Sequence, residues 1–261
     1  MPHDSKFLAP GDYDPVKNKI RVRSIVKALA RAYPDARTSL HYRSTFELLI
    51  ATILSAQSTD VMVNKVTPVL FERYPTPDAL AAADPDVVEN IIRSTGFFRQ
   101  KTKAIIGAAR TIVTDFGGDV PATMAELTTV PGAARKTANV VLANTKPRPG
   151  SDHGIFVDTH IRRVSQRLGL TLHDDPVKIE RDLMELLPQR TWVDVPHQLI
   201  LLGRGPCDAR KPDHPSCPLL RWCPTGQAAL AQGVQAAPPP RSRRASGAKP
   251  RSRAKATPAL P

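Results

Sequence analysis

Residues 122–144, ATMAELTTVPGAARKTANVVLAN, decide the fold, because they place a tight turn at Pro131-Gly132 between two short apolar segments. Pro121 opens the first segment, which runs to Leu127, and both segments are predicted to be helices. The stretch is therefore predicted to be a helix–hairpin–helix. Gly132 has no Cβ, so the backbone of the turn can approach an anion closely. Amides at the start of the second helix point toward such an anion, which makes the hairpin a candidate phosphate site.

Lys136 falls in the first turn of the second helix of this hairpin, where the helix dipole disfavours a positive charge. An amine whose ammonium form is destabilised is a better nucleophile near neutral pH, as a Schiff-base lysine requires. A plain phosphate-binding lysine is the alternative. Asp158 opens a later helix and, taken alone, is predicted to be its N-cap. The hairpin, taken alone, also fits an ordinary helical corner.

The rest of the body is also predicted to be helical, since alternating strand patterning is weak throughout. Ser44 and Glu47 form the capping-box pattern, and Asp60 is predicted to cap the next helix, which Pro75 and Pro77 close. The fold class is therefore all-α. The other predicted helices cover residues 16–33, 45–57, 84–93, 98–115, 158–168, 176–187 and 192–203, and residues 145–154 form a Pro/Gly-rich loop.

The charge balance indicates a polyanionic partner. The chain has 261 residues, with 37 Lys and Arg against 24 Asp and Glu, a formal net charge of +13. Residues 224–261 hold seven of the basic residues and no acid, so the body still carries +6. Nucleic acid is the simplest partner for such a chain, and an anionic membrane surface is the alternative. The Ala-, Pro- and Arg-rich tail over 226–261 is predicted to be disordered, as a solubilising extension or a DNA tether.

The sequence contains neither a long apolar run nor a secretory signal, so a soluble, cytoplasmic protein is expected. All three cysteines lie within a short segment, Cys207-x6-His214-x2-Cys217-x5-Cys223. An odd number of clustered cysteines disfavours a disulfide framework and favours a metal site in a reducing compartment.

Several motifs in one order resemble the endonuclease III family of helix–hairpin–helix DNA glycosylases. They are FELLIATILSAQSTD, STGFFRQKTKAI, VPGAARKTANVVLAN, VDTH and the cysteine cluster, which together span roughly residues 15–225. The resemblance implies a bifunctional DNA N-glycosylase/AP lyase that excises oxidised pyrimidines in base excision repair. Its partner would be double-stranded DNA with a damaged pyrimidine or an abasic site. A lyase with an altered lesion pocket and a non-catalytic binder of damaged DNA are the alternatives.

The resemblance also implies roles for single residues. Lys136 would attack C1′ of the damaged nucleotide, and Asp158 would stabilise the cationic sugar and help Lys136 lose its proton. Residues expected to contact DNA include Gln57, which fills the space left by the flipped base, and Phe97, a wedge between bases. The remaining expected contacts are Gly132 and Ala134 in the hairpin and Arg210 and Lys211 on the cysteine loop, and Asp60 and His160 match family positions near the site.

Three departures from the family pattern bear on these expectations. His214 stands where the family has a cysteine, so Cys207, His214, Cys217 and Cys223 could hold a [4Fe–4S] cluster, a zinc ion or no metal. Ala134 stands where the family usually has a second glycine, which would cost about 1 kcal/mol if that position needs a positive φ. The 145–154 loop is longer than usual and could reshape the base pocket.

These interpretations give a two-domain protein with a DNA-binding cleft between the domains. Residues 35–145 are predicted to form a helical bundle with the hairpin, and residues 15–34 with 146–225 a second domain with the metal loop. Residues 1–14 are a predicted N-terminal extension. The protein is expected to act as a monomer and to associate with the nucleoid.

Overall fold

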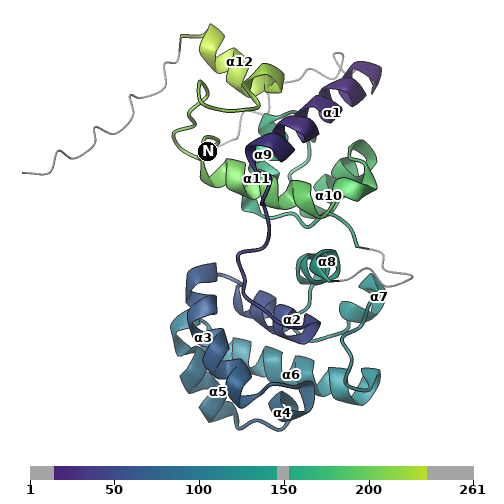
Figure 1. The fold of residues 1–261 in the computed structure, drawn as a ribbon, viewed down its shortest axis with the longest axis vertical. Helices are drawn as coiled ribbons and strands as arrows, with labels where there is room; N and C mark the ends of the chain where they lie inside the picture. The colour runs from purple at the N-terminus through teal and green to yellow at the C-terminus, as the bar shows by residue number, and fades with distance from the viewer. Residues whose placement is uncertain (1–14, 146–152, 234–261) are drawn as a thin grey trace, which may run out of the picture.

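The computed structural model describes residues 15–145 and 153–233, and over those residues all regular structure is helical (Figure 1). The all-α fold class is therefore confirmed for the part of the chain described. No helix in these two ranges combines the length and apolar character that crossing a membrane requires. The predicted N-terminal extension, most of the 145–154 loop and the tail beyond residue 233 lie outside the described residues.

The helices are α1 Pro15–Ala32, α2 Thr45–Leu54, α3 Asp60–Arg73, α4 Pro77–Ala81, α5 Pro85–Ile92, α6 Phe98–Phe116, α7 Met124–Leu127, α8 Arg135–Asn144, α9 Thr159–Arg167, α10 Pro176–Leu186, α11 Asp194–Arg204 and α12 Pro224–Ala231, with 3₁₀ turns at Arg93–Thr95, Gln189–Thr191 and Leu220–Trp222.

Local capping signals set where α2 begins. The Glu47 amide donates to Ser44 Oγ at 3.1 Å, which satisfies one of the free N–H groups of the first turn. The Glu47 carboxylate in turn accepts from the Arg43 amide at 2.6 Å. The predicted capping pattern is confirmed, although the Glu47 carboxylate accepts from the amide of Arg43, one residue before the N-cap Ser44.

Several details of the predicted helices were wrong. Helix α7 begins at Met124 with Thr123 as its N-cap, and not at Pro121. Pro77 opens the short helix α4 instead of closing the preceding one, because proline is well suited to the first helical turn. Thr59, not Asp60, caps α3, because the Thr59 side chain accepts from the Met62 amide. The predicted disordered tail begins too early, because α12 covers residues up to Ala231. A thiol sulfur caps α12, with the Gly226 amide donating to Cys223 Sγ at 3.3 Å.

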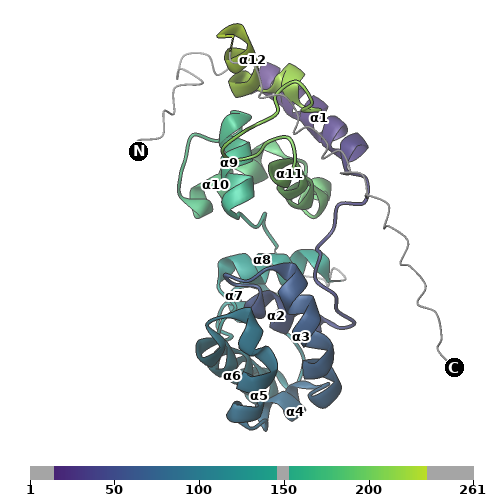
Figure 2. The ribbon, with the colours of Figure 1, turned by 90° about the vertical axis from the view of Figure 1, so that its left-hand side faces the viewer.

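The buried apolar side chains form two separate clusters. One draws on residues from Leu40 to Leu142 and fills the interior of α2–α7 with one side of α8. The other combines α1 with residues from Ile155 to Cys223. Helix α8 contributes to both, because Val141 lies in the first cluster and Val140 in the second. Both views place α8 between the α2–α7 group and the group formed by α1 and α9–α12 (Figures 1 and 2).

Helix α1 packs against the C-terminal half of the chain, far from it in sequence. The Arg21 guanidinium donates to the carbonyls of Leu168 at 2.6 Å, Gly169 at 3.0 Å and Trp222 at 3.2 Å. Three accepting carbonyls compensate for the removal of the charge from water. The N-terminal helix is therefore held beside the segment that carries the cysteines.

Replacing Leu49 should cost more stability than replacing an exposed leucine. Leu49 is fully buried in the first cluster, whereas Leu172 is 61% exposed. We expect Leu49→Ala to lower the free energy of unfolding by about 3 kcal/mol, because it leaves a cavity. Leu172→Ala should change it by less than about 0.5 kcal/mol. Urea unfolding of both variants followed by circular dichroism checks the difference, and equal losses would contradict the packing described.

Candidate active site

The predicted hairpin is present, with α7 and α8 joined by the turn at Pro131-Gly132. Gly132 has φ of +79°, a conformation that L-residues with a side chain rarely adopt. A Cβ at Gly132 would also lie 3.1 Å from Ile53 Cγ2 and 3.3 Å from Ala104 Cβ. The turn therefore rests directly on α2 and α6; its backbone conformation favours glycine, and its surroundings leave little room for a Cβ.

Ala134 does not need a positive φ, so the cost that would apply in that case is absent. Its φ is −59° and its ψ is 165°, an extended conformation open to any residue. Ala134 is the N-cap of α8 and makes no capping bond through its side chain. The absence of the family's usual second glycine is therefore compatible with the turn.

Lys136 and Asp158 each lie at the beginning of a helix. Lys136 is the exposed second residue of α8, as expected. Asp158 is the half-buried N-cap of α9, and its Oδ1 accepts from the Ile161 amide at 2.8 Å. Within the described ranges, Asp158 Oδ2 accepts no hydrogen bond, so one carboxylate oxygen stays open to another donor. The segment before Asp158 is tied to α8, because the Gly154 amide donates to Asn139 Oδ1 at 2.7 Å.

A buried histidine that the sequence analysis missed lies near Asp158. His197, on α11, is 6% exposed, and its ring centre is 5.1 Å from that of Phe156. Burial lowers the pKa of His197, and the carboxylates of Asp194 and Asp158 act in the opposite direction. Its Nε2 has no hydrogen-bond partner among the described residues. The sequence does contain one signal for this residue: His197 interrupts the apolar side chains of residues 194–204, which indicates a buried polar group.

Gln57 and Phe97, the two side chains expected to enter the DNA, share an unusual backbone. Their φ values are +52° and +48°, and among the described residues they alone combine a side chain with a positive φ. Such a conformation costs on the order of 1 kcal/mol and tends to occur at functional sites. Both side chains are exposed, Phe97 by 60%. The structure thus presents both at sharp turns.

A buried lysine supports the turn that carries Phe97. Lys101, on α6, is 6% exposed, and its Nζ donates to the Thr95 carbonyl at 2.8 Å. Burial lowers the pKa of Lys101 because desolvation disfavours the ammonium form. Nothing in the sequence distinguishes Lys101 from other lysines, since a lysine in the middle of a helix usually faces solvent.

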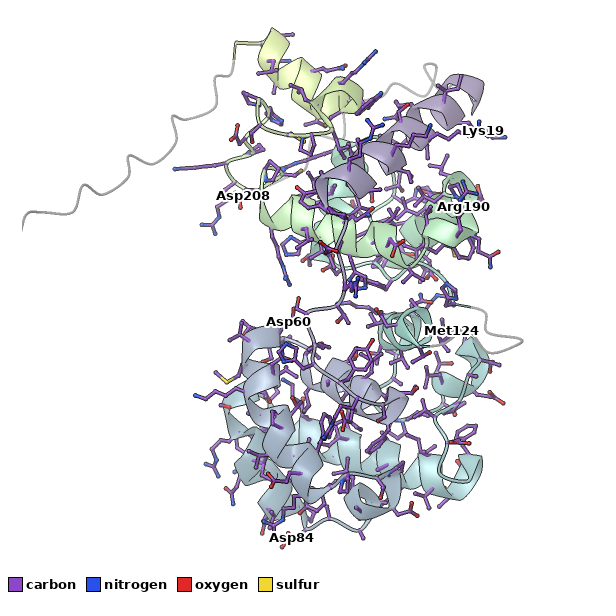
Figure 3. All side chains as sticks on the ribbon, in the orientation of Figure 1. Lys19, Asp60, Asp84, Met124, Arg190 and Asp208 are labelled. Atoms are coloured by element: carbon purple, nitrogen blue, oxygen red, sulfur yellow. The ribbon has the colours of Figure 1, made fainter. Side chains whose placement is uncertain are left out.

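The loop that begins at Cys207 is held by arginines from α9. Arg163 donates to the Cys207 carbonyl at 3.2 Å, and Arg167 donates to the Asp208 carbonyl at 2.7 Å. The amides of Arg210 and Lys211 donate to Asp208 Oδ1 at 2.8 and 2.9 Å. The bonds from Lys211 and Arg210 lower the pKa of the Asp208 carboxyl. The loop leaves the Arg210 and Lys211 side chains exposed, in the region where Figure 3 labels Asp208.

The four expected metal ligands lie in one region of the structure. Gly226 is next to two of them, because a Cβ there would lie 3.2 Å from His214 Nδ1 and 3.6 Å from Cys223 Sγ. Burial raises the pKa of Cys217 to about 11, and the charges of Cys223 and Cys207 add to this rise. Within the described residues, however, no three His, Cys, Asp or Glu side chains are close enough to hold a metal ion. The donor types fit a metal centre, and the thiols are free in this structure.

Asp60 and His160 have arginine partners. Asp60 Oδ2 is 3.4 Å from Arg204 Nη2, so a salt bridge joins the start of α3 to the end of α11. Figure 3 labels Asp60 on the side of the α2–α7 group that faces the other group. His160 Nδ1 is 3.3 Å from Arg163 Nη2, and within the described ranges His160 makes no hydrogen bond to Asp158.

Comparison with known proteins decides the family. The profile of the HhH-GPD superfamily base excision DNA repair proteins matches residues 50–189. Endonuclease III of Synechocystis sp. is 53% identical over 210 residues, which cover 80% of this chain and 94% of that protein. The chain belongs to the endonuclease III family. Endonuclease III of Escherichia coli, another member, is 39% identical over 206 residues, 79% of this chain and 96% of the relative.

Solved structures of the family have the same fold. A non-covalent endonuclease III–DNA complex is 41% identical, with a TM-score of 0.75 over 82% of this chain and 98% of that one. A trapped endonuclease III–DNA covalent intermediate is also 41% identical, with a TM-score of 0.74 over 81% and 98% of the two chains. A thermostable thymine-DNA glycosylase, 20% identical with a TM-score of 0.72, shares the fold.

The two hairpin positions should respond differently to substitution. We expect Gly132→Ala to lower stability by about 1–3 kcal/mol, because alanine there is strained and crowded. Ala134→Gly, the matched control, should change stability by less than about 1 kcal/mol, because φ is already negative. Thermal unfolding measures both effects. A larger loss from Ala134→Gly than from Gly132→Ala would contradict the geometry of the turn.

Proposed function

We propose that the chain is a bifunctional DNA glycosylase and AP lyase of base excision repair, acting on double-stranded DNA with a damaged pyrimidine or an abasic site. The observation that carries this proposal is Lys136, exposed in the first turn of the hairpin helix α8. Family membership supports it, because a solved relative is described as a trapped covalent intermediate with DNA.

The proposed chemistry needs an amine and a carboxylate that act on the same nucleotide, and Lys136 and Asp158 would supply them. Lys136 Nζ attacks C1′, so a C–N bond to the lysine forms while the bond to the base breaks and the base leaves. The Asp158 carboxylate stabilises the positive charge on the sugar and accepts the proton that Lys136 loses. The sugar ring opens to a Schiff base. Loss of a C2′ proton then expels the 3′ phosphate, which nicks the strand.

Lys136 can reach C1′ only when the nucleotide has left the base stack. Gln57 would occupy the vacated space and hydrogen-bond to the orphaned base, and Phe97 would wedge between neighbouring bases. Their strained, exposed turns suit residues that enter a duplex. Arg210 and Lys211, on the loop held by α9, would contact phosphates, as would the amides at Gly132 and Ala134. The two apolar clusters would be the cores of two domains with DNA between them.

Cys207, His214, Cys217 and Cys223 would hold a [4Fe–4S] cluster, the group the family generally contains. Three thiols and an imidazole are chemically suited to such a cluster. When bound, the cluster would supply structural support for the Arg210–Lys211 loop and take no part in base excision. A substrate of duplex DNA also agrees with the cytoplasmic, nucleoid-associated location expected from the sequence, and we propose that the protein acts as a monomer.

Borohydride trapping tests the nucleophile. Duplexes with thymine glycol or an abasic site are incubated with the protein and sodium borohydride, which reduces a Schiff base to a stable adduct. We expect the wild-type protein to form an adduct with both duplexes. The yield of adduct should fall by at least about 100-fold in Lys136→Gln, because the side-chain amide cannot attack C1′. Lys178→Gln, which changes an exposed lysine on α10, is the control and should trap normally.

The other outcomes separate the alternatives. An adduct with the abasic duplex alone would indicate a lyase with an altered lesion pocket. No adduct with either duplex, from protein that binds DNA, would reject Lys136 as the nucleophile and leave a non-catalytic DNA-binding protein.

Metal analysis tests the cluster. We expect anaerobically purified protein to contain iron and acid-labile sulfide with broad absorption near 400 nm, and His214→Ala to lose most of the iron because a ligand is missing. His214→Cys, which restores the family's ligand type, is the matched variant and should retain the iron. Stoichiometric zinc, or no metal in protein with the wild-type fold, would contradict the cluster.

A further inference from the structure

One buried carboxylate outside the chemistry just described contacts the helix that carries Lys136. Glu180 lies on α10, and its side chain is 5% exposed. Its Oε2 accepts from Arg135 Nε at 2.7 Å. Its Oε1 accepts from Arg135 Nη2 at 3.1 Å and from Asn139 Nδ2 at 2.8 Å. Both oxygens are thus occupied by donors from α8, one of which comes from the residue next to Lys136.

The same group of bonds reaches the segment that leads to Asp158. Asn139 is 1% exposed, and while its Nδ2 donates to Glu180, its Oδ1 accepts from the Gly154 amide at 2.7 Å. The chain from Gly154 to Asp158 passes through Ile155, Phe156 and Val157, which are all buried. A change in the position of Gly154 is therefore transmitted to Asp158 by a short segment packed on every side.

Two anchors on one face fix the position of α8. Arg135 and Asn139 are four residues apart, so their side chains leave the same side of the helix about one turn apart. Lys136 follows Arg135 directly and projects about 100° further round. Apolar packing on the two clusters has little directional preference, whereas hydrogen bonds have a preferred geometry. The bonds to Glu180 thus constrain how α8 can rotate and shift along its axis.

Gly154 leaves the space that this arrangement needs. A Cβ on Gly154 would overlap Glu180 Oε1 and would lie 3.2 Å from Met184 Sδ. The φ of Gly154 is not in the left-handed region, so the absence of a side chain here serves the Glu180 carboxylate and not the backbone.

We propose that Glu180 is a positioning residue, which sets Lys136 relative to Asp158 through Arg135, Asn139 and the Gly154 amide. The inference rests on the proposed function of Lys136 and Asp158. The ion pair is weak support for stability, because the Arg135 side chain is 49% exposed and desolvation of the buried Glu180 carboxylate offsets much of the attraction. The four directional bonds suit alignment better, and misplacing reacting groups by about 1 Å can reduce a rate about 100-fold.

The test separates binding from chemistry. Borohydride trapping of the full-length protein is measured in a single turnover on a duplex with a preformed abasic site, at saturating DNA. Affinity is measured by fluorescence anisotropy with a duplex that contains a tetrahydrofuran abasic analogue. We expect Glu180→Ala to slow trapping by about 30- to 100-fold while the Kd changes less than about threefold. Glu180→Gln keeps one accepting oxygen and should recover part of the rate.

Asp182→Ala is the matched control, because Asp182 is a carboxylate on the same helix whose partner is Thr171. We expect it to trap within about twofold of the wild-type rate. If Glu180→Ala does not fold, Gly154→Ala tests the same bonds, because its new methyl group displaces the Glu180 carboxylate. We expect that variant to slow trapping at saturating DNA as well.

The outcomes distinguish this inference from the proposed function. Absence of trapping by the wild-type protein would reject Lys136 as the nucleophile. Wild-type trapping that Glu180→Ala and Gly154→Ala leave unchanged at saturating DNA would overturn the positioning role alone. An effect of Glu180→Ala on Kd alone, with the trapping rate unchanged, would also overturn it. So would a fall in the trapping rate that Asp182→Ala matches.

Discussion

Helix α8 is packed from two sides, and the arrangement of the functional groups depends on this constraint. Val141 belongs to one apolar cluster and Val140 to the other, although the two residues are adjacent. A helix in this position can present little besides its first turn to solvent. Lys136 occupies that turn, and Gly132 allows the chain to reach it by a turn that rests on α2 and α6. Burial of the rest of the helix thus leaves the first turn, which carries Lys136, as the exposed part of α8.

Local signals in the sequence predicted much of this fold, because they depend on a few neighbouring residues. The capping pattern at Ser44, the hairpin and the Asp158 N-cap are of this kind. The apolar period also predicted most helices. Helix α12 was not predicted, because its Ala-rich sequence resembles that of a disordered tail. What holds it is a distant contact, in which Thr225 donates to the Arg167 carbonyl, 58 residues away. Whether Ala134 needs a positive φ could not be predicted from the sequence, because φ is set by the whole turn.

The buried polar groups show why a site is harder to predict than a fold. Glu180 lies between Leu183 and Ile179 in an apolar stripe, where a charge is costly without partners. Its position in the sequence signals that partners exist, but Arg135 and Asn139 are more than 40 residues away. Lys101 and His197 are likewise buried, although Lys101 bonds Thr95 only six residues away and His197 is affected by both Asp194, on its own helix, and the more distant Asp158. Such groups become recognisable only when the tertiary contacts are known.

The contacts of α1 have a consequence for synthesis on the ribosome. Arg21 donates to the carbonyl of Trp222, 201 residues later in the chain. Helix α1 is made before the α2–α7 group, yet its partners are made after that group, which can be completed when residues up to α8 have been made. The nascent chain must therefore carry an unpaired amphipathic helix through most of translation. Docking of α1 would be among the last steps of folding, and it would join the two ends of the described chain.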